Sequence, residues 1–410
     1  MIAALAATLL ALRLAGELIL ARLNLLELGR HSEGPPPALA GLLDDTAYAR
    51  SVAYSRAKLR FGMVSECFDT GIVAALLLSG LLPWLHTEFA SWAPDATWNQ
   101  ALFLICVALL MGIPSLPFEW WSQFRIEQRF GFNNAGPALW VGDKLRDTAV
   151  GVLIGFPLLW LLLSLVAWVG SSWWLMAFGV VFAFQLAMIV LYPKLILPLY
   201  NKLSPLEEGE LRTRLMALAE RTGFQARSID VIDGSKRSGH SNAYFSGFGR
   251  FRRIVLYDTL VQQLSAEELE AVLAHEIGHY RCGHVPRMIA MSAAMMFGVF
   301  ALIAWLSSSA WFNPAFGFAP GLLAPSFLLV ALLAGSASFW LTPLVNALSR
   351  RHEYEADAFA AKAMGTPAPL LSALRKLAGK NLTNLTPHPL YSGFHYSHPT
   401  LVERQRALSA

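Results

Sequence analysis

Two long stretches of the chain, residues 148–193 and 288–349, contain no charged side chain. A membrane-spanning helix needs about 20 consecutive apolar residues, so each stretch is long enough for two such helices. Each stretch also carries a turn signal, at residues 170–172 (Gly-Ser-Ser) in the first and in a Pro- and Gly-rich run at 313–321 in the second. The sequence therefore predicts two helical hairpins that cross a membrane.

Three further apolar segments are long enough to span a membrane, and they lie at 2–25, 67–85 and 101–118. Composition agrees, because 55% of the 410 residues are hydrophobic and only 15% are charged, outside the usual range of soluble domains. Together with the hairpins, these segments give seven predicted spans. Arg13 and Glu17 interrupt the first span. One interpretation is that they pair on a side that faces protein or water, and the alternative is that their side chains extend to the helix ends.

The positively charged residues fall into alternate connections, 22–60, 119–146, 194–287 and from 350 onward, whereas 87–100, 170–172 and 308–320 have none. Cytoplasmic loops of membrane proteins carry the excess of Lys and Arg. We therefore expect the N-terminus outside and the polar segments on the cytoplasmic side. The predicted partner is the lipid bilayer, and no basic stripe indicates nucleic-acid binding.

Residues 275–279 have the sequence His-Glu-Ile-Gly-His, which is the pattern His-Glu-x-x-His. Ser265 and Glu268 form a capping-box pattern that predicts a helix start just before it. On such a helix His275 and His279 lie on one face, where both imidazoles can bind one Zn²⁺. Glu276 then lies beside the metal and can take a proton from the attacking water. The alternative interpretation is a solvated helix face.

The third zinc ligand is predicted on a second helical segment, at 346–360, that contains neither Gly nor Pro. Glu353 and Asp357 are four residues apart and share a helix face, so Glu353 can bind the metal while Asp357 holds a ligand histidine by its other ring nitrogen. By itself this segment could also be an exposed helix with Glu355 paired to arginines, pointing away from Glu353. His284 and His352 are alternative ligands by chemistry alone.

The polar region before the motif predicts a small sheet. Residues 227–232, 242–248 and 253–257 have strand character, with a turn at 247–249 and Asp230 facing outward, and Ser204 begins a pattern typical of a helix start. We expect residues 242–257 to supply an edge of this sheet, to which an extended peptide substrate adds a strand.

Over nearly its whole length the chain resembles the integral-membrane zinc metalloprotease family of type I CAAX prenyl endopeptidases. The segments that carry the resemblance are 124–133 (Phe-Arg-Ile-Glu-Gln-Arg-Phe-Gly-Phe-Asn), 197–202 (Leu-Pro-Leu-Tyr-Asn-Lys), 240–245 (His-Ser-Asn-Ala-Tyr-Phe), 275–284, 349–360 and 395–399 (His-Tyr-Ser-His-Pro). The resemblance implies a mainly α, multi-pass membrane fold in which seven transmembrane helices enclose a water-filled chamber. A zincin-like α+β catalytic domain lies on its cytoplasmic side.

The resemblance also implies site roles that agree with the spacing: His275, His279 and Glu353 as ligands of one zinc ion and Glu276 as the base. It adds contacts from Asn242 and His398 to the substrate backbone or the oxyanion. It implies cleavage of the last three residues from a prenylated Cys-a-a-X C-terminus, or of related membrane-protein substrates.

Four segments are expected: a five-helix transmembrane region with cytoplasmic loops (1–193), a first catalytic segment that contains the His-Glu-x-x-His motif (194–287), transmembrane helices six and seven (288–349) and a second catalytic segment that contains the glutamate ligand (350–410). The Ala-, Leu- and Arg-rich composition favours a bacterial inner membrane. A heat-shock-type quality-control metalloprotease, a non-catalytic membrane scaffold, and a channel or transporter that uses charged residues inside the membrane remain alternatives.

Overall fold

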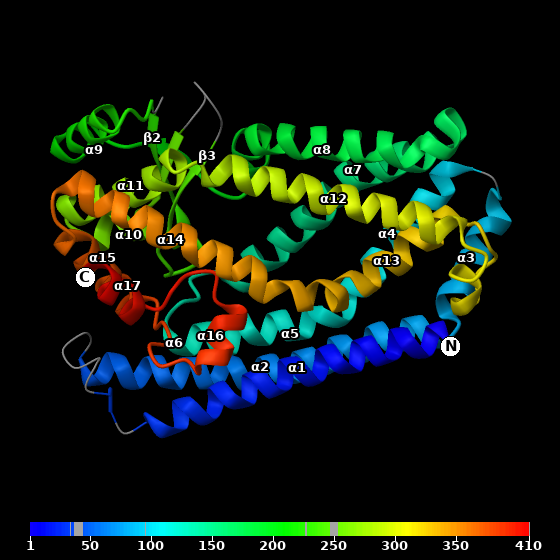
Figure 1. The fold of residues 1–410 in the computed structure, drawn as a ribbon, viewed down its shortest axis with the longest axis horizontal. Helices are drawn as coiled ribbons and strands as arrows, with labels where there is room; N and C mark the ends of the chain where they lie inside the picture. Colours follow the sequence, from blue (N-terminus) through cyan, green and yellow to red (C-terminus); the bar gives the residue numbers. More distant parts are fainter. Residues whose placement is uncertain (33, 37–43, 95, 226–227, 247–252, 410) are drawn as a thin grey trace.

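The computed structural model describes the chain except for residues 33, 37–43, 95, 226–227, 247–252 and 410. Long helices run along the longest axis of the molecule, and a small sheet with several shorter helices gathers at one end (Figure 1). The C-terminal helix lies at this same end, whereas the N-terminus lies at the opposite one. The polar regions on either side of helices α12 (His284–Ser308) and α13 (Leu323–Ser338) are therefore brought together in space.

The first two helices, α1 (Ile2–Arg30) and α2 (Asp45–Leu78), lie side by side. Helix α2 begins early because the Asp44 carboxylate accepts a hydrogen bond from the Ala47 amide at 2.7 Å. It ends before Gly80, whose φ of 77° lets the chain turn into α3 (Leu81–Trp92). The predicted second span, 67–85, is therefore misplaced: the helix starts much earlier and the chain turns within that segment.

Arg13 and Glu17 do not pair with each other, although both face protein. Arg13 donates to Glu66 of α2 at 2.8 Å, and Glu17 lies 3.4 Å from His395. The two charges in the first helix therefore connect it to two other elements.

The next helices form a bundle that includes the first predicted hairpin. Helix α4 (Thr97–Gly112) continues through four short helical turns, η2 (Ile113–Ser115), α5 (Leu116–Trp121), η3 (Ser122–Glu127) and α6 (Gln128–Phe130). Helix α7 (Pro137–Val169) and helix α8 (Trp173–Leu191) meet at the turn η4 (Gly170–Ser172), which confirms the turn signal. Turns η5 (Tyr192–Ile196) and η6 (Leu197–Leu199) follow α8.

The second uncharged stretch forms α12 (His284–Ser308) and α13 (Leu323–Ser338), with turn η9 (Asn313–Phe316) in the predicted Pro- and Gly-rich run. After η10 (Phe339–Leu341) the chain continues into α14 (Thr342–Met364). Helix α14 passes position 350 without a break. The membrane segment and the predicted third ligand therefore belong to one nearly continuous rod.

Six segments of the described chain are long and apolar enough to cross a membrane, where seven spans were predicted. One of the six is 63 residues long and contains both α7 and α8. Large apolar side chains point outward from these segments, with Leu153 75% exposed and Leu344 69% exposed. Such a surface is suited to lipid rather than water. The segments are Ile2–Arg30, Asp45–Leu78, Thr97–Phe130, Pro137–Leu199, His284–Ser308 and Leu323–Met364.

Among the described residues, cavities between the helices include two that are lined by α1. One, of about 640 Å³, is lined mainly by α1, α2 and residues 381–396. The other, of about 470 Å³, lies among α1, α2, α4, α7 and α13.

The sheet has the strand order β1-β2-β4-β3, formed by β1 (Leu203–Pro205), β2 (Ser228–Ile232), β4 (Arg253–Tyr257) and β3 (Ala243–Ser246). Strands β2 and β4 are parallel, and β1 and β3 are antiparallel to their neighbours. Two expectations were wrong: Ser204 lies in β1 rather than at a helix start, and Asp230 is buried next to Arg253, at 3.6 Å. The expected turn at 247–249 lies outside the described residues.

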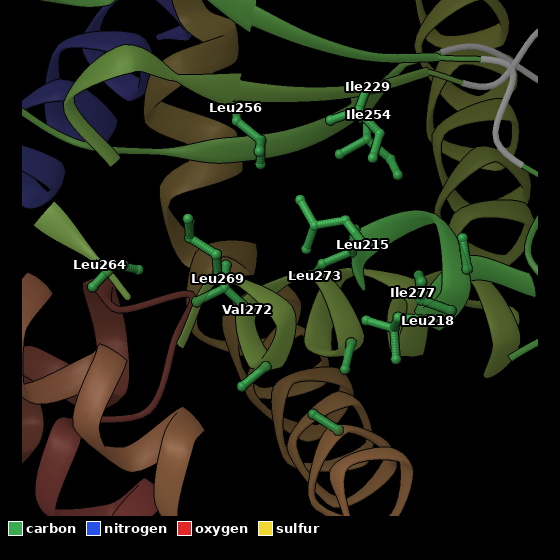
Figure 2. Packing of buried hydrophobic residues seen from close by; sticks show 14 of the residues in the cluster. Leu215, Leu218, Ile229, Ile254, Leu256, Leu264, Leu269, Val272, Leu273 and Ile277 are labelled. Carbon is green, nitrogen blue, oxygen red and sulfur yellow. The ribbon is translucent and has the colours of Figure 1, made fainter. Parts of the chain in front are cut away.

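The sheet packs on α9 (Glu210–Arg221), α10 (Asp258–Gln263) and α11 (Ala266–Arg281) around a buried apolar core. Figure 2 shows Ile254 and Leu256 of β4 facing Leu215 of α9 and Leu269 and Leu273 of α11. Helix α15 (Ala368–Lys380) packs on the far side of α11, and α16 (Pro389–His395) and α17 (Leu401–Ser409) complete this end. One face of α11 is thereby fixed in the core.

Candidate metal centre

The opposite face of α11 carries the two histidines of the motif. The capping box is present, with the Ser265 amide donating to Glu268 at 2.8 Å and the Glu268 amide donating to Ser265 at 3.3 Å. Because the helix begins at this cap and buries its apolar face in the core, the direction of the His275 and His279 side chains is fixed.

Helices α11 and α14 approach each other closely at Gly278 and Ala356. A Cβ atom at Gly278 would lie 3.0 Å from both the Cα atom and the carbonyl oxygen of Ala356. Only glycine leaves room for this approach. The contact brings Glu353, one turn before Ala356 on α14, opposite the two histidines.

Three potential ligand atoms meet between these helices. The Nε2 atoms of His275 and His279 are 3.2 Å apart, and they lie 3.5 Å and 3.2 Å from the nearest oxygens of Glu353. Ligand atoms bound tetrahedrally to zinc at about 2.0–2.1 Å are separated by roughly 3.3–3.4 Å. The geometry of the group therefore fits a zinc ion.

The environment of Glu353 also fits a cation. Its side chain is buried, and among the described residues its Oε2 atom has no hydrogen-bond partner. A buried carboxylate oxygen without a partner is costly, and a metal ion between it and the imidazoles would satisfy it. Imidazole nitrogens with one carboxylate form a donor set that zinc accepts.

Asp357 contacts the first histidine from behind. Its Oδ1 atom lies 2.8 Å from His275 Nδ1, so the carboxylate can accept a hydrogen bond from an Nδ1–H group and leave Nε2 free for a metal. Burial opposes protonation, but the Asp357 and Glu353 carboxylates raise the pKa of His275 to about 9. A metal would bind Nε2 of the neutral ring, with the Nδ1–H group held by Asp357.

Arg404 of α17 completes this side of the centre, and the sequence analysis missed it. Its Nε donates to Asp357 Oδ2 at 2.8 Å, Nη2 contacts Asp357 Oδ1, and Nη1 lies 3.7 Å from Glu353 Oε2. The side chain is buried. In the sequence it is one of several polar residues on a short amphipathic helix, and nothing near it indicates a role in the site.

The other predicted site residues lie at different places. Burial raises the pKa of the Glu276 carboxyl, which follows His275 on α11. His398 has its Nε2 3.4 Å from Glu353 Oε1 and an exposed side chain. Asn242 precedes β3, is exposed, and its side-chain oxygen accepts from the Ala243 amide. Glu276 and His398 are thus close to the metal-binding group, whereas the Asn242 side chain bonds to adjacent backbone.

His284 and His352, the alternative ligands, do not belong to the group. His284 contacts Nδ1 of His279, the nitrogen remote from Glu353, and His352 stacks on His284 with ring centroids 4.1 Å apart. Both side chains are buried, and neither belongs to the group formed by His275, His279 and Glu353.

Both halves of the chain match known protein families. Residues 24–202 match a family described as CAAX prenyl protease N-terminal, five membrane helices, and residues 205–410 match peptidase family M48. These two matches cover the membrane region and the region that contains the metal-binding group.

Similar proteins extend over most of the chain. CAAX prenyl protease 1 of Saccharomyces cerevisiae is 36% identical, covering 91% of this chain and 88% of that protein. The human CAAX prenyl protease 1 homolog is 32% identical, covering 91% and 88%. The crystal structure of S. mikatae Ste24p matches with a TM-score of 0.91 and 33% identity, covering 99% of this chain and 98% of that one. The resemblance found in the sequence is thereby confirmed: the chain belongs to peptidase family M48, in its CAAX prenyl protease group, and is a multi-pass membrane zinc metallopeptidase.

Proposed function

We propose that this protein removes the last three residues from a prenylated Cys-a-a-X C-terminus, or cleaves related membrane-protein substrates. The observation that carries the proposal is a pair of imidazole nitrogens 3.2 Å apart, each within 3.5 Å of an oxygen of the Glu353 carboxylate, on a chain whose relatives are named CAAX prenyl proteases. In this proposal His275, His279 and Glu353 hold one zinc ion, and Asp357 orients His275.

Bound zinc would polarise the scissile carbonyl and acidify the attacking water. Glu276 takes a proton from that water and passes it to the leaving amine, a role typically worth about 10²–10⁴ in rate. Burial raises the pKa of Glu276, which suits a group that must act first as a base and then as an acid. His398, beside Glu353 and exposed, donates a hydrogen bond to the oxyanion, a contribution of about 2.7–4 kcal/mol in other enzymes.

The substrate is proposed to bind as an extended strand along β3, with Asn242 contacting its backbone. Two observations support this: β3 is one of the two outer strands of the sheet, and it packs against α11, which carries the histidines. An added strand needs backbone N–H groups, which proline lacks. A proline scan of a substrate peptide is expected to abolish cleavage at alternate positions, and unchanged cleavage at every position would contradict this binding mode.

A heat-shock-type protease remains the main alternative. The CAAX group is favoured because residues 24–202, which precede the His-Glu-x-x-His half of the chain, match a family described as CAAX prenyl protease N-terminal. A bacterial cell, which the composition favours, generally has no prenylated Cys-a-a-X substrates of its own. We therefore propose unprenylated membrane proteins as the physiological substrates there, with prenylated peptides cleaved in vitro by the same chemistry.

We infer that seven helices span the membrane, with α7 and α8 as separate spans. The metal-binding end, built from 194–287 and 350–410, would then face the cytoplasm of a bacterial inner membrane. The distribution of Lys and Arg supports this orientation. Exposed tryptophans at the opposite end support a membrane interface there, since tryptophan is enriched at such interfaces. They are Trp84, Trp92, Trp98, Trp168, Trp305 and Trp311.

The decisive experiment is cleavage of a farnesylated Cys-a-a-X peptide by the purified full-length protein, with the zinc content measured on the same samples. Glu276→Ala should abolish cleavage and keep about one zinc per chain, because Glu276 is proposed as base and not as ligand. Glu267→Ala, on an exposed face of the same helix, is the matched control and should cleave normally.

Three other outcomes would change the proposal. Absence of zinc from the unchanged protein would overturn the metal site. Full zinc with cleavage of only unprenylated membrane-protein substrates would replace the CAAX activity by the quality-control alternative. If Glu276→Ala cleaves the peptide as fast as the unchanged protein does, Glu276 has no role in the mechanism.

A further inference from the structure

His284 lies directly behind the second ligand histidine. It is the first residue of α12, and Gly283 with a φ of 72° turns the chain back so that the His284 ring faces α11. Its Nδ1 is 2.9 Å from His279 Nδ1, and its Nε2 is 3.0 Å from Glu355 Oε2. The ring is 1% exposed. His279, His284 and Glu355 therefore form an unbroken line from the metal-binding group to the surface.

With zinc bound, only one arrangement of protons fits this line. His279 must keep its Nε2 lone pair for the metal, so its proton is on Nδ1. That N–H points at His284 Nδ1, which must therefore accept and carry no proton. His284 then carries its proton on Nε2, where the Glu355 carboxylate accepts it. Each ring nitrogen has one role, and no donor faces another donor.

The last two members of the line are themselves held in place. The His284 ring stacks on His352, with centroids 4.1 Å apart and planes inclined by 14°. Glu355 accepts from Arg351 Nε at 3.0 Å and lies 3.7 Å from Arg287 Nη1. Two arginines keep the carboxylate charged and aimed at His284. The line therefore has a fixed outer end as well as a fixed inner end.

We propose that His284 and Glu355 are positioning residues that fix the tautomer and ring orientation of His279, as Asp357 does for His275. The inference rests on the proposed zinc ligation. It assigns to Glu355, which shares α14 with Glu353 but points away from it, a role in holding the metal. Removing a contact of this kind typically lowers metal affinity or activity by about 10–100-fold.

The test measures the rate at which the zinc-loaded full-length protein releases zinc to an excess of a chromogenic chelator. His284→Phe keeps the ring and its stacking on His352 but removes the acceptor, and it should accelerate release by about 10–100-fold. His284→Asn should restore slow release, because its side-chain oxygen is attached to Cγ as Nδ1 is in histidine. Glu355→Gln, at the surface, should give an intermediate rate.

The matched control is His352→Phe, which changes the stacked ring without touching His279, and it should release zinc like the unchanged protein. If His284→Phe and the unchanged protein both hold full zinc and release it at equal rates, the proposed role of His284 is overturned and the proposed function stays intact. Equal acceleration by His284→Phe and His352→Phe would also overturn that role, because packing would then explain the effect. An unchanged protein without zinc would instead contradict the proposed function. Should His284→Phe fail to fold, the rate of zinc release from Glu355→Gln decides alone. A rate equal to that of the unchanged protein then overturns the proposed role of His284 and Glu355.

Discussion

At the residue scale, Arg404 shows how much of the centre depends on one distant side chain. Its guanidinium contacts both oxygens of Asp357, and both side chains are buried. Removing one member of a buried ion pair leaves an uncompensated charge, which typically costs about 3–5 kcal/mol. Arg404 therefore stabilises the carboxylate that in turn orients His275.

Arg404→Leu is expected to lower the free energy of unfolding of the catalytic end by about 3–5 kcal/mol, because Asp357 would remain charged and buried. Thermal unfolding of the purified protein in detergent measures the effect. The double variant Arg404→Leu with Asp357→Asn should lose less stability, since the buried charge is gone. Equal losses in the single and double variants would contradict this explanation.

The sequence indicated only those site residues that carry a local signal. His275, His279 and Glu353 stand in helical patterns, and the structure brings them within 4.8 Å of one another. Arg404 has no such signal, and His284 was considered only as an alternative ligand, because their contacts depend on how α17 and α12 pack against α11 and α14. Glu355 was expected to point away from Glu353, and it does, but toward His284.

At the scale of elements, the contact between α11 and α14 sets the distance between Glu353 and the two histidines of the motif. The Gly278 backbone lies directly against Ala356, and neither backbone can move aside without moving its helix. A methyl group there would separate the helices and carry Glu353 away from the histidines.

Gly278→Ala is therefore expected to cost about 1–3 kcal/mol in stability, as overpacked sites usually do, and to weaken zinc binding. Zinc affinity by chelator competition and the melting temperature measure both effects. Gly298→Ala is the matched control, because it also lies within a helix but a Cβ there meets open space. If Gly278→Ala and Gly298→Ala have the same zinc affinity and melting temperature, the close approach of the two helices is unimportant for the metal site.

Some elements could not be predicted from local patterns. Strand β1 has three residues, ends in Pro205 and exists through its pairing with β2, so it has no alternation of its own. Asp230 was expected to face outward, yet β2 lies between two strands and Asp230 is buried beside Arg253. By contrast, the capping box of α11 and the turn between α7 and α8 depend on neighbouring residues and were predicted.

At the scale of the whole molecule, polar and apolar regions are separated along the longest axis (Figure 1). The sheet and the metal-binding group lie at one end, and α3 with its exposed Trp84 and Trp92 lies at the other. This arrangement makes the inferred membrane orientation directly testable.

A variant in which Cys67, Cys106 and Cys282 are replaced by serine provides a background for single-cysteine labelling. In intact bacterial cells a membrane-impermeant maleimide should label Ser171→Cys, at the turn between α7 and α8, without permeabilisation. Glu208→Cys, whose native side chain is 88% exposed near the sheet, should react only after permeabilisation. The reverse labelling pattern would show that the orientation is opposite to the inferred one. Labelling of both cysteines without permeabilisation would exclude the inferred orientation.

The order of the ligands along the chain has a consequence for biosynthesis. The two histidines precede α12 and α13, whereas Glu353 and Arg404 follow them. While these membrane helices are being inserted, a nascent chain holds only two of the three proposed zinc ligands, and we expect it to bind the metal weakly. With the proposed ligands, we expect proteolytic activity to begin only once α14 and α17 have left the ribosome, so that an unfinished molecule does not cleave its neighbours in the membrane.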